Sequence, residues 1–340
     1  LRWRPAPPFS RRMDMESAAT AAMGAKGQFP SEHGGDGSFE RQEDAFRDWV
    51  LAEPDTAYPA AAGRYHLYVS LACPWASRTV IVRKLKRLED AIGMTVVDPI
   101  RDERGWAFRD GPGHSRDKTE GFEFLAEAYH AAVSDFTGRV PVPVLWDTVT
   151  RRIVNNSEDD ICRMFCEGFA AFGDESEDLF PKDIEKEHRA ISEFIYEYVN
   201  NGVYKAGFAT RQEVYEAACR ELFEALDQLE GRLRRSRFLF GTRIVEADWR
   251  LFCTLIRFDA VYHGDFKCNM RRIVDYANLQ GYLLDLYQHP RIASTVNLHH
   301  IKRHYYVTKG DINPTRIVPI GPAFELERAH GRESLGEARR

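Results

Sequence analysis

The chain has 340 residues and a formal net charge of -5, a length that accommodates two domains of ordinary size. The slightly acidic balance gives no overall attraction for nucleic acid or for an anionic membrane surface. Apolar residues make up 44% of the chain but are interrupted by charges, so no run approaches the roughly 20 apolar residues of a membrane span. We therefore expect a soluble globular protein with neither nucleic acid nor a membrane as partner.

Residues 1–38 show little hydrophobic periodicity. The first twelve are basic and rich in proline, and no acidic residue precedes Asp14. This composition also suits an organellar transit peptide, although it lacks the apolar core of a secretory signal. The stretch that follows is rich in Ala, Gly and Ser, with few residues that could form a core. We expect 1–38 to be a disordered or loosely wrapped extension and the protein to be cytoplasmic, with organellar targeting left open.

Residues 65–76 have the pattern of a short strand with alternating side chains, followed by a cysteine at the start of a helix. Pro74 suits the first helical position because its ring presets the backbone angle and its missing N–H would have no partner there. The unpaired N–H groups and the positive dipole end of this helix favour a thiolate at Cys73. Basic side chains on the same helix add positive charge: Arg78, Arg83 and Lys84. We expect Cys73 to have a lowered pKa and to act as a nucleophile, the alternative being a buried, inert thiol.

The six cysteines lack the spacing of a disulfide framework, which favours free thiols in a reducing compartment. Cys162 and Cys166 lie four residues apart on an expected helix, a spacing compatible with a pair of metal ligands. The histidine or cysteine partners of a zinc site are missing around them. We expect these two cysteines to pack in the core and the protein to bind no metal.

Strands and helices alternate through the first half of the chain. A docking turn or short helix is expected at 39–52, where apolar residues recur at helical spacing. The further elements expected are a strand from 65, a helix at 76–88, a strand at 94–97, a polar loop at 101–117, a helix at 122–133, a strand at 140–146, and a strand within 153–161 that ends in acidic helix-start residues. This order predicts a thioredoxin-like α/β domain over residues 39–168.

Every long segment from residue 184 onward has a helical pattern. Helices are expected at 184–199, 212–235 and 246–261, with shorter ones after 276. In the second of these, apolar residues recur at helical intervals: Leu222, Phe223, Leu226, Leu229 and Leu233. The pattern predicts an all-α domain over 182–316. Residues 317–340 form a tail that we expect to wrap the surface and fray.

This two-domain plan resembles the cytosolic glutathione transferase architecture. The blocks that narrow the resemblance are Leu71-Ala72-Cys73-Pro74-Trp75-Ala76, Gly105-Trp106, Val142-Pro143-Val144-Leu145-Trp146-Asp147, Asn200-Asn201-Gly202-Val203-Tyr204-Lys205-Ala206-Gly207-Phe208, Ala247-Asp248-Trp249-Arg250-Leu251-Phe252, Ile256-Arg257-Phe258-Asp259 with Val261-Tyr262-His263, and Ile301-Lys302-Arg303-His304-Tyr305-Tyr306. In this order they resemble the Xi class, the glutathionyl-hydroquinone reductases, from about Phe39 to Pro322.

The resemblance implies a thiol reaction with glutathione as co-substrate and a glutathionylated quinol as substrate. Cys73 attacks the glutathione sulfur, the hydroquinone leaves, and a second glutathione resolves the mixed disulfide to give glutathione disulfide. The place of a second cysteine in a Cys-x-x-Cys pair holds Ala76, which excludes a dithiol exchange there. The resemblance also implies a homodimer, although the sequence shows no self-complementary patch.

The resemblance also implies roles for other residues. Pro143 is expected to be cis and to let the Val142 backbone pair with the cysteinyl part of glutathione, the alternative being a simple proline at a strand entry. Trp106 matches the indole that covers glutathione, with a buried loop anchor as the alternative. Tyr204 and Tyr305 match tyrosines that bind the quinol oxygens and move a proton, although a tyrosine is more often structural. Further members implied for this acceptor pocket are Tyr306, Tyr262 and Arg303.

Three positions depart from the family pattern. Ser157 precedes Glu158, the reverse of the expected acidic-then-serine pair that holds the γ-glutamyl amine and carboxylate. Either Asn156 and Ser157 take these roles with the helix one residue earlier, or Glu158 turns to the amine while Ser157 and backbone N–H groups hold the carboxylate. Ser77 replaces an expected histidine, and Val245 replaces a hydroxyl helix cap.

Two other functions stay open on the sequence. One is a broader Omega-like thiol transferase acting on mixed disulfides, dehydroascorbate or α-glutathionyl ketones, since the same thiol attacks any activated glutathione sulfur. The other is a binding protein without catalysis. The retained Cys73 and Pro74 argue against that alternative, whereas Ser77 and the Ser157-Glu158 order argue mildly for it.

Overall fold

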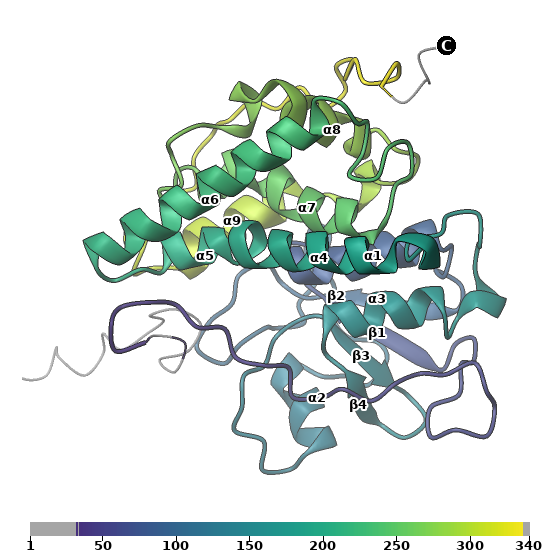
Figure 1. Cartoon of the computed structure of the whole chain (residues 1–340). Coiled ribbons are helices and arrows are strands. Elements are labelled where there is room, and N and C mark those ends of the chain that lie inside the picture. Colours follow the sequence, from purple (N-terminus) through teal and green to yellow (C-terminus); the bar gives the residue numbers. More distant parts are fainter. Residues whose placement is uncertain (1–31, 33, 336–340) are drawn as a thin grey trace, which may run out of the picture.

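A computed structural model describes Glu32 and residues 34–335, so most of the extension expected at 1–38 lies outside the described part. The chain folds as a mixed sheet with its helices, followed by a bundle of helices packed against it (Figure 1). Among the described helices, none is long and apolar enough to cross a membrane.

The N-terminal domain is built on a four-stranded sheet in the order β2-β1-β3-β4. Its strands are β1 (Tyr65–Val69), β2 (Ile92–Val96), β3 (Val144–Asp147) and β4 (Arg152–Asn155). β2 pairs parallel to β1, and β3 pairs antiparallel with both β1 and β4. Two helices, α1 (Pro74–Leu85) and α3 (Glu158–Cys166), pack together on the side of the helical domain, whereas α2 (Leu125–Ala132) lies against β4 (Figure 1). This is the thioredoxin-like arrangement that the sequence predicts.

The strand that follows Pro143 begins later than expected. The sequence predicts it from residue 140, but β3 starts at Val144. Pro141 and Pro143 lack the N–H groups that a central strand donates to its neighbours, which explains the later start. The Val142–Pro143 peptide bond is cis, as predicted.

The segment at 39–52 forms no helix, so the expectation of a short helix is wrong. Its backbone amides donate instead to residues along β4: Asp48 to Val154 O at 3.0 Å, and Phe46 to Asn156 Oδ1 at 2.9 Å. Amides used in this way are not available for helical hydrogen bonds. At the start of the segment, the ring of Phe39 packs against that of Phe208 in the helical domain, with centroids 5.2 Å apart. The segment therefore bridges the two domains.

The helical domain follows the expected order. Its helices are α4 (Glu185–Phe194), α5 (Gly202–Gly207), α6 (Gln212–Leu233), α7 (Glu246–Arg257), α8 (Ala277–Tyr287) and α9 (Leu298–Thr308). The predicted apolar face of α6 is confirmed, since all five of its spaced residues are buried. Two of the helices continue into π-helical turns, α4 at Ile195–Asn200 and α7 at Phe258–Tyr262. Such wide turns occur often at functional sites.

Asp248 stabilises the start of α7, which has no hydroxyl cap. Val245 precedes this helix and has no side-chain acceptor, but the Asp248 carboxylate accepts from its backbone N–H at 2.9 Å. The same carboxylate accepts from the Leu239 N–H at 2.9 Å and from the Tyr282 hydroxyl at 2.8 Å. The Asp248 carboxylate thus supplies one half of a capping box, and the Asp248 N–H donates to Val245 O at 3.0 Å in place of a hydroxyl.

The described part of the tail, residues 317–335, contains no helix. Its buried Arg332 donates to Leu233 O at the end of α6 at 2.9 Å. This contact anchors the tail to the helical domain.

Candidate active site

Cys73 lies between the end of β1 and the first turn of α1. Pro74 is the first residue of that helix, and Cys73 is its N-cap. The Sγ atom lies 3.6 Å from the carbonyl oxygen of Val142, beside the cis bond to Pro143. Cys73 is half-buried, whereas Cys162 on α3 is fully buried in the core. The thiol is therefore held at a helix N-terminus, against the loop that carries the cis-proline.

Arg257, at the C-terminal end of α7, holds the cysteine loop from the second domain. Its buried guanidinium donates to four acceptors of that loop: Leu71 O and Ala72 O at 3.0 Å each, Cys73 O at 3.4 Å and Ser77 Oγ at 2.6 Å. Ser77 therefore gains a partner at the position where a histidine is expected. The sequence marks Arg257 only as part of a family block. The sequence gives one further indication that Arg257 is functional, because it places a cation in a largely apolar helix.

Burial raises the pKa of the Cys73 thiol, which is the opposite of the expected lowering. The backbone N–H of Ala76, the Arg257 guanidinium and the N–H of Trp75 oppose this rise in pKa. The helix N-terminus thus stabilises negative charge on Sγ, as predicted, but desolvation is the larger effect on the pKa.

The basic side chains of α1 are engaged elsewhere. Their partners are Asp159 and Glu246 for Arg78, Ile92 O for Arg83 at 2.8 Å, and Glu89 for Lys84 at 2.9 Å. The expectation that these three cations activate Cys73 is wrong, because carboxylates and a carbonyl take up their charge. The cation that acts on the thiol comes from α7.

Three tyrosine hydroxyls form a buried chain near the cysteine loop. The hydroxyl of Tyr305 on α9 lies 2.5 Å from that of Tyr204 on α5 and 3.0 Å from that of Tyr262. Burial raises the pKa of all three phenols, so they hold their protons at neutral pH. Trp75 connects them to the cysteine loop, since its ring meets the ring of Tyr204 edge-on with centroids 5.4 Å apart. The structure thus brings together three tyrosines that the sequence singles out from distant segments.

Tyr306 and Arg303 lie outside this chain of hydroxyls. Tyr306 is half-buried, and its hydroxyl donates to Ala260 O at 3.3 Å. Burial raises the pKa of Tyr306 to about 12. Arg303 is half-buried, and its guanidinium forms no hydrogen bond or ion pair with the described residues.

Trp106 is buried against the second domain. Its ring stacks on that of His304 of α9, with centroids 5.0 Å apart and an interplanar angle of 23°. Its carbonyl accepts from the Leu125 N–H at 2.9 Å, and His304 Nδ1 lies 2.8 Å from Pro99 O. These contacts anchor the 101–117 loop to α9. A role of the indole toward glutathione stays a prediction.

The Ser157–Glu158 pair lies at the start of α3. This helix begins at Glu158 with Ser157 as its N-cap, so it does not start one residue earlier. Asn156 uses its side-chain oxygen on the Phe46 N–H at 2.9 Å. These facts favour the arrangement in which Ser157 and Glu158 themselves serve the γ-glutamyl group. Burial raises the pKa of Glu158 to about 7, although Arg78 acts to lower it.

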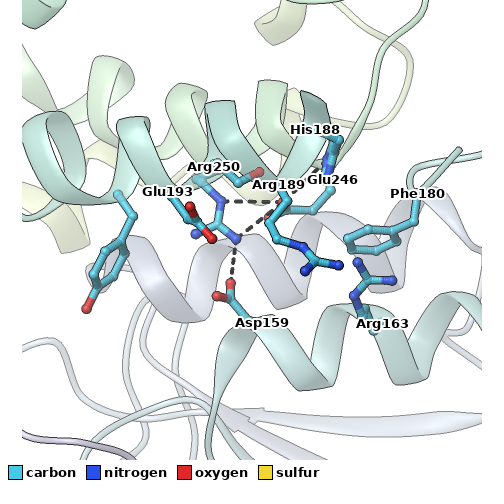
Figure 2. Close-up of a pocket in the computed structure, with 10 residues that line it drawn as sticks. Asp159, Arg163, Phe180, His188, Arg189, Glu193, Glu246 and Arg250 are labelled. Atoms are coloured by element: carbon cyan, nitrogen blue, oxygen red, sulfur yellow. Dashed lines mark hydrogen bonds and ion pairs between the residues drawn. The ribbon is translucent and has the colours of Figure 1, made fainter. Parts of the chain in front are cut away.

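A cavity of about 250 Å³ lies between the domains at Asp159, the residue after Glu158 (Figure 2). Figure 2 shows Asp159 of α3 directed at Arg250 of α7, and the two side chains are 2.6 Å apart. Arg250 also lies 3.4 Å from Glu246, which lies 3.2 Å from Arg78 and 3.9 Å from His188. Arg250 and Asp159 are therefore paired across the domain boundary at this cavity.

Comparison with known proteins agrees with this geometry. Residues 72–167 match the glutathione S-transferase N-terminal domain, and residues 212–284 match the glutathione S-transferase C-terminal domain. Glutathionyl-hydroquinone reductase YqjG of Escherichia coli is 47% identical over 304 residues, which are 87% of this chain and 93% of that protein. Glutathionyl-hydroquinone reductase PcpF of Sphingobium chlorophenolicum is 46% identical over 290 residues, 85% of this chain and 91% of that protein.

Solved structures share the fold over the same span. The glutathione-bound structure of Escherichia coli YqjG has a TM-score of 0.83 at 48% identity and covers 85% of this chain and 96% of its own. The Xi glutathione S-transferase from Phanerochaete chrysosporium has a TM-score of 0.83 at 46% identity, with 85% and 94% covered. The Xi class protein from Natrialba magadii has a TM-score of 0.84 at 47% identity, with 88% and 96% covered. Because this likeness extends over both domains, the chain belongs to the Xi class of the glutathione transferase family.

Proposed function

We propose that the protein is a glutathionyl-hydroquinone reductase, which converts a glutathionyl-hydroquinone and glutathione into the hydroquinone and glutathione disulfide. The observation that carries this proposal is a lone thiol, Cys73, at a helix N-terminus near three joined tyrosine hydroxyls from the second domain. Two relatives more than two fifths identical over most of the chain bear this activity in their names.

The proposed reaction has two steps. Cys73 Sγ attacks the thioether sulfur, and the carbon–sulfur bond breaks with its electron pair going to the ring carbon, which takes up a proton. A disulfide between Cys73 and glutathione forms in the same step. A glutathione thiolate then attacks the glutathione sulfur of that disulfide, frees Cys73 and leaves as glutathione disulfide. Ala76 stands where a second protein thiol would be, so the resolving thiol is glutathione itself.

The tyrosine chain is the proton source in this proposal. Tyr204 and Tyr305 bind the quinol oxygens, and one of these phenols gives the proton that the ring carbon takes up. Tyr262 shares a hydrogen bond with Tyr305 and restores the proton through it. A phenol whose pKa is raised by burial keeps the proton until the developing carbanion needs it.

Glutathione is proposed to lie along the cis-proline loop. The Val142 backbone pairs with its cysteinyl part, and Trp106 covers it. Ser157 and the N–H groups at the start of α3 hold its α-carboxylate, and Glu158 accepts its amine. Tyr306 and Arg303 are proposed only as outer members of the acceptor pocket.

The direct test is mass spectrometry of the protein mixed with glutathionyl-1,4-hydroquinone and no added glutathione. Cys73 should gain one glutathione while an equal amount of hydroquinone is released. Cys73→Ser should show neither change. A protein that releases no hydroquinone, with or without added glutathione, would contradict the reductase function.

A broader thiol transferase is the second candidate, since the same nucleophile attacks other activated glutathione sulfurs. A relative 41% identical over 300 residues is named glutathione S-transferase omega-like 2, from Schizosaccharomyces pombe. Side-by-side turnover of a glutathionyl-hydroquinone, a glutathione mixed disulfide and dehydroascorbate separates the two. Faster turnover of either of the last two would favour the transferase.

We also propose that the protein is a homodimer, as the resemblance to the Xi class implies. The segments before Tyr65 and after Tyr276 are the surfaces proposed for this interface. Light scattering measures the mass in solution, and a value near 39.1 kDa would contradict a dimer.

A further inference from the structure

A half-buried and a buried cation, from opposite ends of the chain, lie against the tyrosine cluster. The guanidinium carbon of Arg41, in the N-terminal segment, lies 4.5 Å from the ring centroid of Trp75 and 4.9 Å from that of Tyr204. Lys309 follows α9 directly, and its Nζ lies 4.1 Å from the ring centroid of Tyr305 and 5.6 Å from that of Tyr204. The two cations therefore share the ring of Tyr204, which is assigned to the acceptor pocket.

Neither cation has a carboxylate partner in the part of the chain that the structure describes. Lys309 is 8% exposed, and its ammonium forms no ion pair or hydrogen bond there. Arg41 donates through Nε to Asn201 Oδ1 at 3.1 Å, but its Nη2 is buried without a partner. Asp265 attracts Lys309 from beyond ion-pair distance, and its own Oδ2 is also buried without a partner.

Two such cations are unfavourable together because Lys309 and the Nη2 atom of Arg41 have lost their water and the two charges repel each other. Burial lowers the pKa of Lys309 well below its usual value; Asp265 opposes this, and Arg101 and Arg41 lower the pKa further. Contacts with aromatic faces attract both cations but offset only part of this cost. An anion held between Arg41 and Lys309 would pair both charges and favour the charged form of the lysine.

We propose that Arg41 and Lys309 form an anion subsite of the acceptor pocket, which binds an acidic substituent such as a carboxylate on the hydroquinone ring. This inference rests on the proposed reductase function and names the class of its substrate, a glutathionyl-hydroquinone that carries an anionic group. A guanidinium suits a planar carboxylate, since it can donate two parallel hydrogen bonds, and the ammonium adds a point charge beside it.

Lys309 and Arg101 contact different aromatic rings, although the backbone N–H of Arg101 donates to Thr308 Oγ1, the neighbour of Lys309, at 3.2 Å. Arg101 lies at Trp106, with its guanidinium carbon 5.7 Å from that ring centroid, on the side proposed to cover glutathione. Lys309 lies instead among the rings of Tyr305, Phe208 and Phe266. A carboxylate of glutathione is common to every substrate, whereas a ring substituent is not. Two substrates that differ only in the charge of the ring substituent therefore show whether the subsite binds that substituent or a carboxylate of glutathione.

The test compares the glutathionyl adduct of 2,5-dihydroxybenzoate with that of 2,5-dihydroxybenzamide, which has the same shape without the charge. For the unaltered protein, we expect kcat/KM to favour the acid by about tenfold, the gain of one charge-assisted hydrogen bond. Lys309→Met keeps the length of the side chain without its charge. It should abolish the preference while leaving turnover of the amide within about threefold.

Lys186→Met is the matched control, because Lys186 is exposed on α4, far from this cluster in sequence, and the preference should persist. Arg41→Gln is a second variant that should also reduce the preference, and it replaces Lys309→Met if circular dichroism shows that variant unfolded. Equal turnover of acid and amide by the unaltered protein, or a preference that survives both variants, overturns the proposal. Equal loss of both substrates with a raised KM for glutathione also overturns it, because Lys309 would then serve glutathione.

A binding measurement keeps this proposal distinct from the reductase function. If the unaltered protein turns over glutathionyl-1,4-hydroquinone but neither substituted adduct, the reductase function stands and the subsite is overturned. If it turns over none of the three, the reductase function fails, and calorimetry with 2,5-dihydroxybenzoate tests the subsite. Binding that Lys309→Met abolishes supports the anion subsite, and no binding overturns it.

Discussion

Two groups of buried charge flank Trp75, and they are built in different ways. In one group every cation has a carboxylate partner. Arg250 pairs with Asp159 and Glu246 (Figure 2), and Arg78 of α1 pairs with the same two carboxylates, so that α1, α3 and α7 are joined. In the other, Arg41 and Lys309 lie over aromatic rings without a carboxylate at ion-pair distance among the described residues. Internally paired charges join the domains, whereas unpaired ones are suited to take their counter-charge from a ligand.

Arg257 is an intermediate case. Its guanidinium has no carboxylate partner among residues 34–335, but carbonyls of the cysteine loop and the Ser77 hydroxyl accept from its N–H groups. It therefore holds the loop of Cys73 in place and leaves net positive charge near the sulfur. The comparison shows that the partners of a buried cation, rather than its burial, indicate what it does.

Removing Arg250 should have the largest effect on stability. Glu246 is 1% exposed and would lose one of its cations, so Arg250→Met should lower the free energy of unfolding by about 4 kcal/mol. Urea denaturation followed by circular dichroism measures the change. The double variant Arg250→Met with Glu246→Gln should recover most of it. A single variant as stable as the unaltered protein would show that the paired group does not join the domains.

Glu158 should make stability depend on pH. Burial raises its pKa from 4.5 to about 7, so between these values the folded chain holds a proton that the unfolded chain releases. The protonated Glu158 contributes its full stabilisation below pH 4.5. As pH rises from there to about 7, the free energy of unfolding should fall by about 2 to 3 kcal/mol. Urea denaturation across this range measures the slope. Glu158→Gln should remove it, and an unchanged slope in that variant would assign it to another group.

Ser77→Ala should have a smaller effect. The change leaves one N–H of the Arg257 guanidinium without its acceptor at 2.6 Å, which costs about 1 kcal/mol in the free energy of unfolding. Ser134→Ala, at an exposed position of the α2–β3 loop, is the control and should change little. If both variants behave alike in urea denaturation, Ser77 does not help to hold Arg257.

Lys309→Met should have the smallest effect on stability. Because this ammonium is buried and no carboxylate of the described residues lies at ion-pair distance, its removal should leave the free energy of unfolding unchanged or raise it by about 1 kcal/mol. The same denaturation experiment measures it beside Arg250→Met. A loss as large as that of Arg250→Met would show that Lys309 is paired within the chain, and the contrast between the two groups would disappear.

The sequence predicts well the features that near neighbours decide. Pro74 places Cys73 at a helix start, and the apolar spacing of α6 requires only a helix and one buried face. The cis bond at Pro143 follows from the family block around it. Even the late start of β3 is a local effect, since two prolines lack the N–H groups that strand pairing needs.

Contacts between distant segments account for what the sequence misses. The segment at 39–52 has a helical spacing of apolar residues, yet β4 takes its amides and keeps it from forming a helix. Desolvation of Cys73 depends on how the second domain covers it, so the sign of its pKa shift is not encoded in the cysteine block alone.

The sequence by itself determines the nucleophile, its helix and the two-domain plan, because these depend on residues within a few turns of one another. Only the tertiary structure decides which cations act on the site. Arg257 reaches the cysteine loop from 184 residues away, and Arg41 and Lys309 meet over the ring of Tyr204 from opposite ends of the chain. A charge acts through distance and burial in space, and neither quantity can be read from sequence spacing.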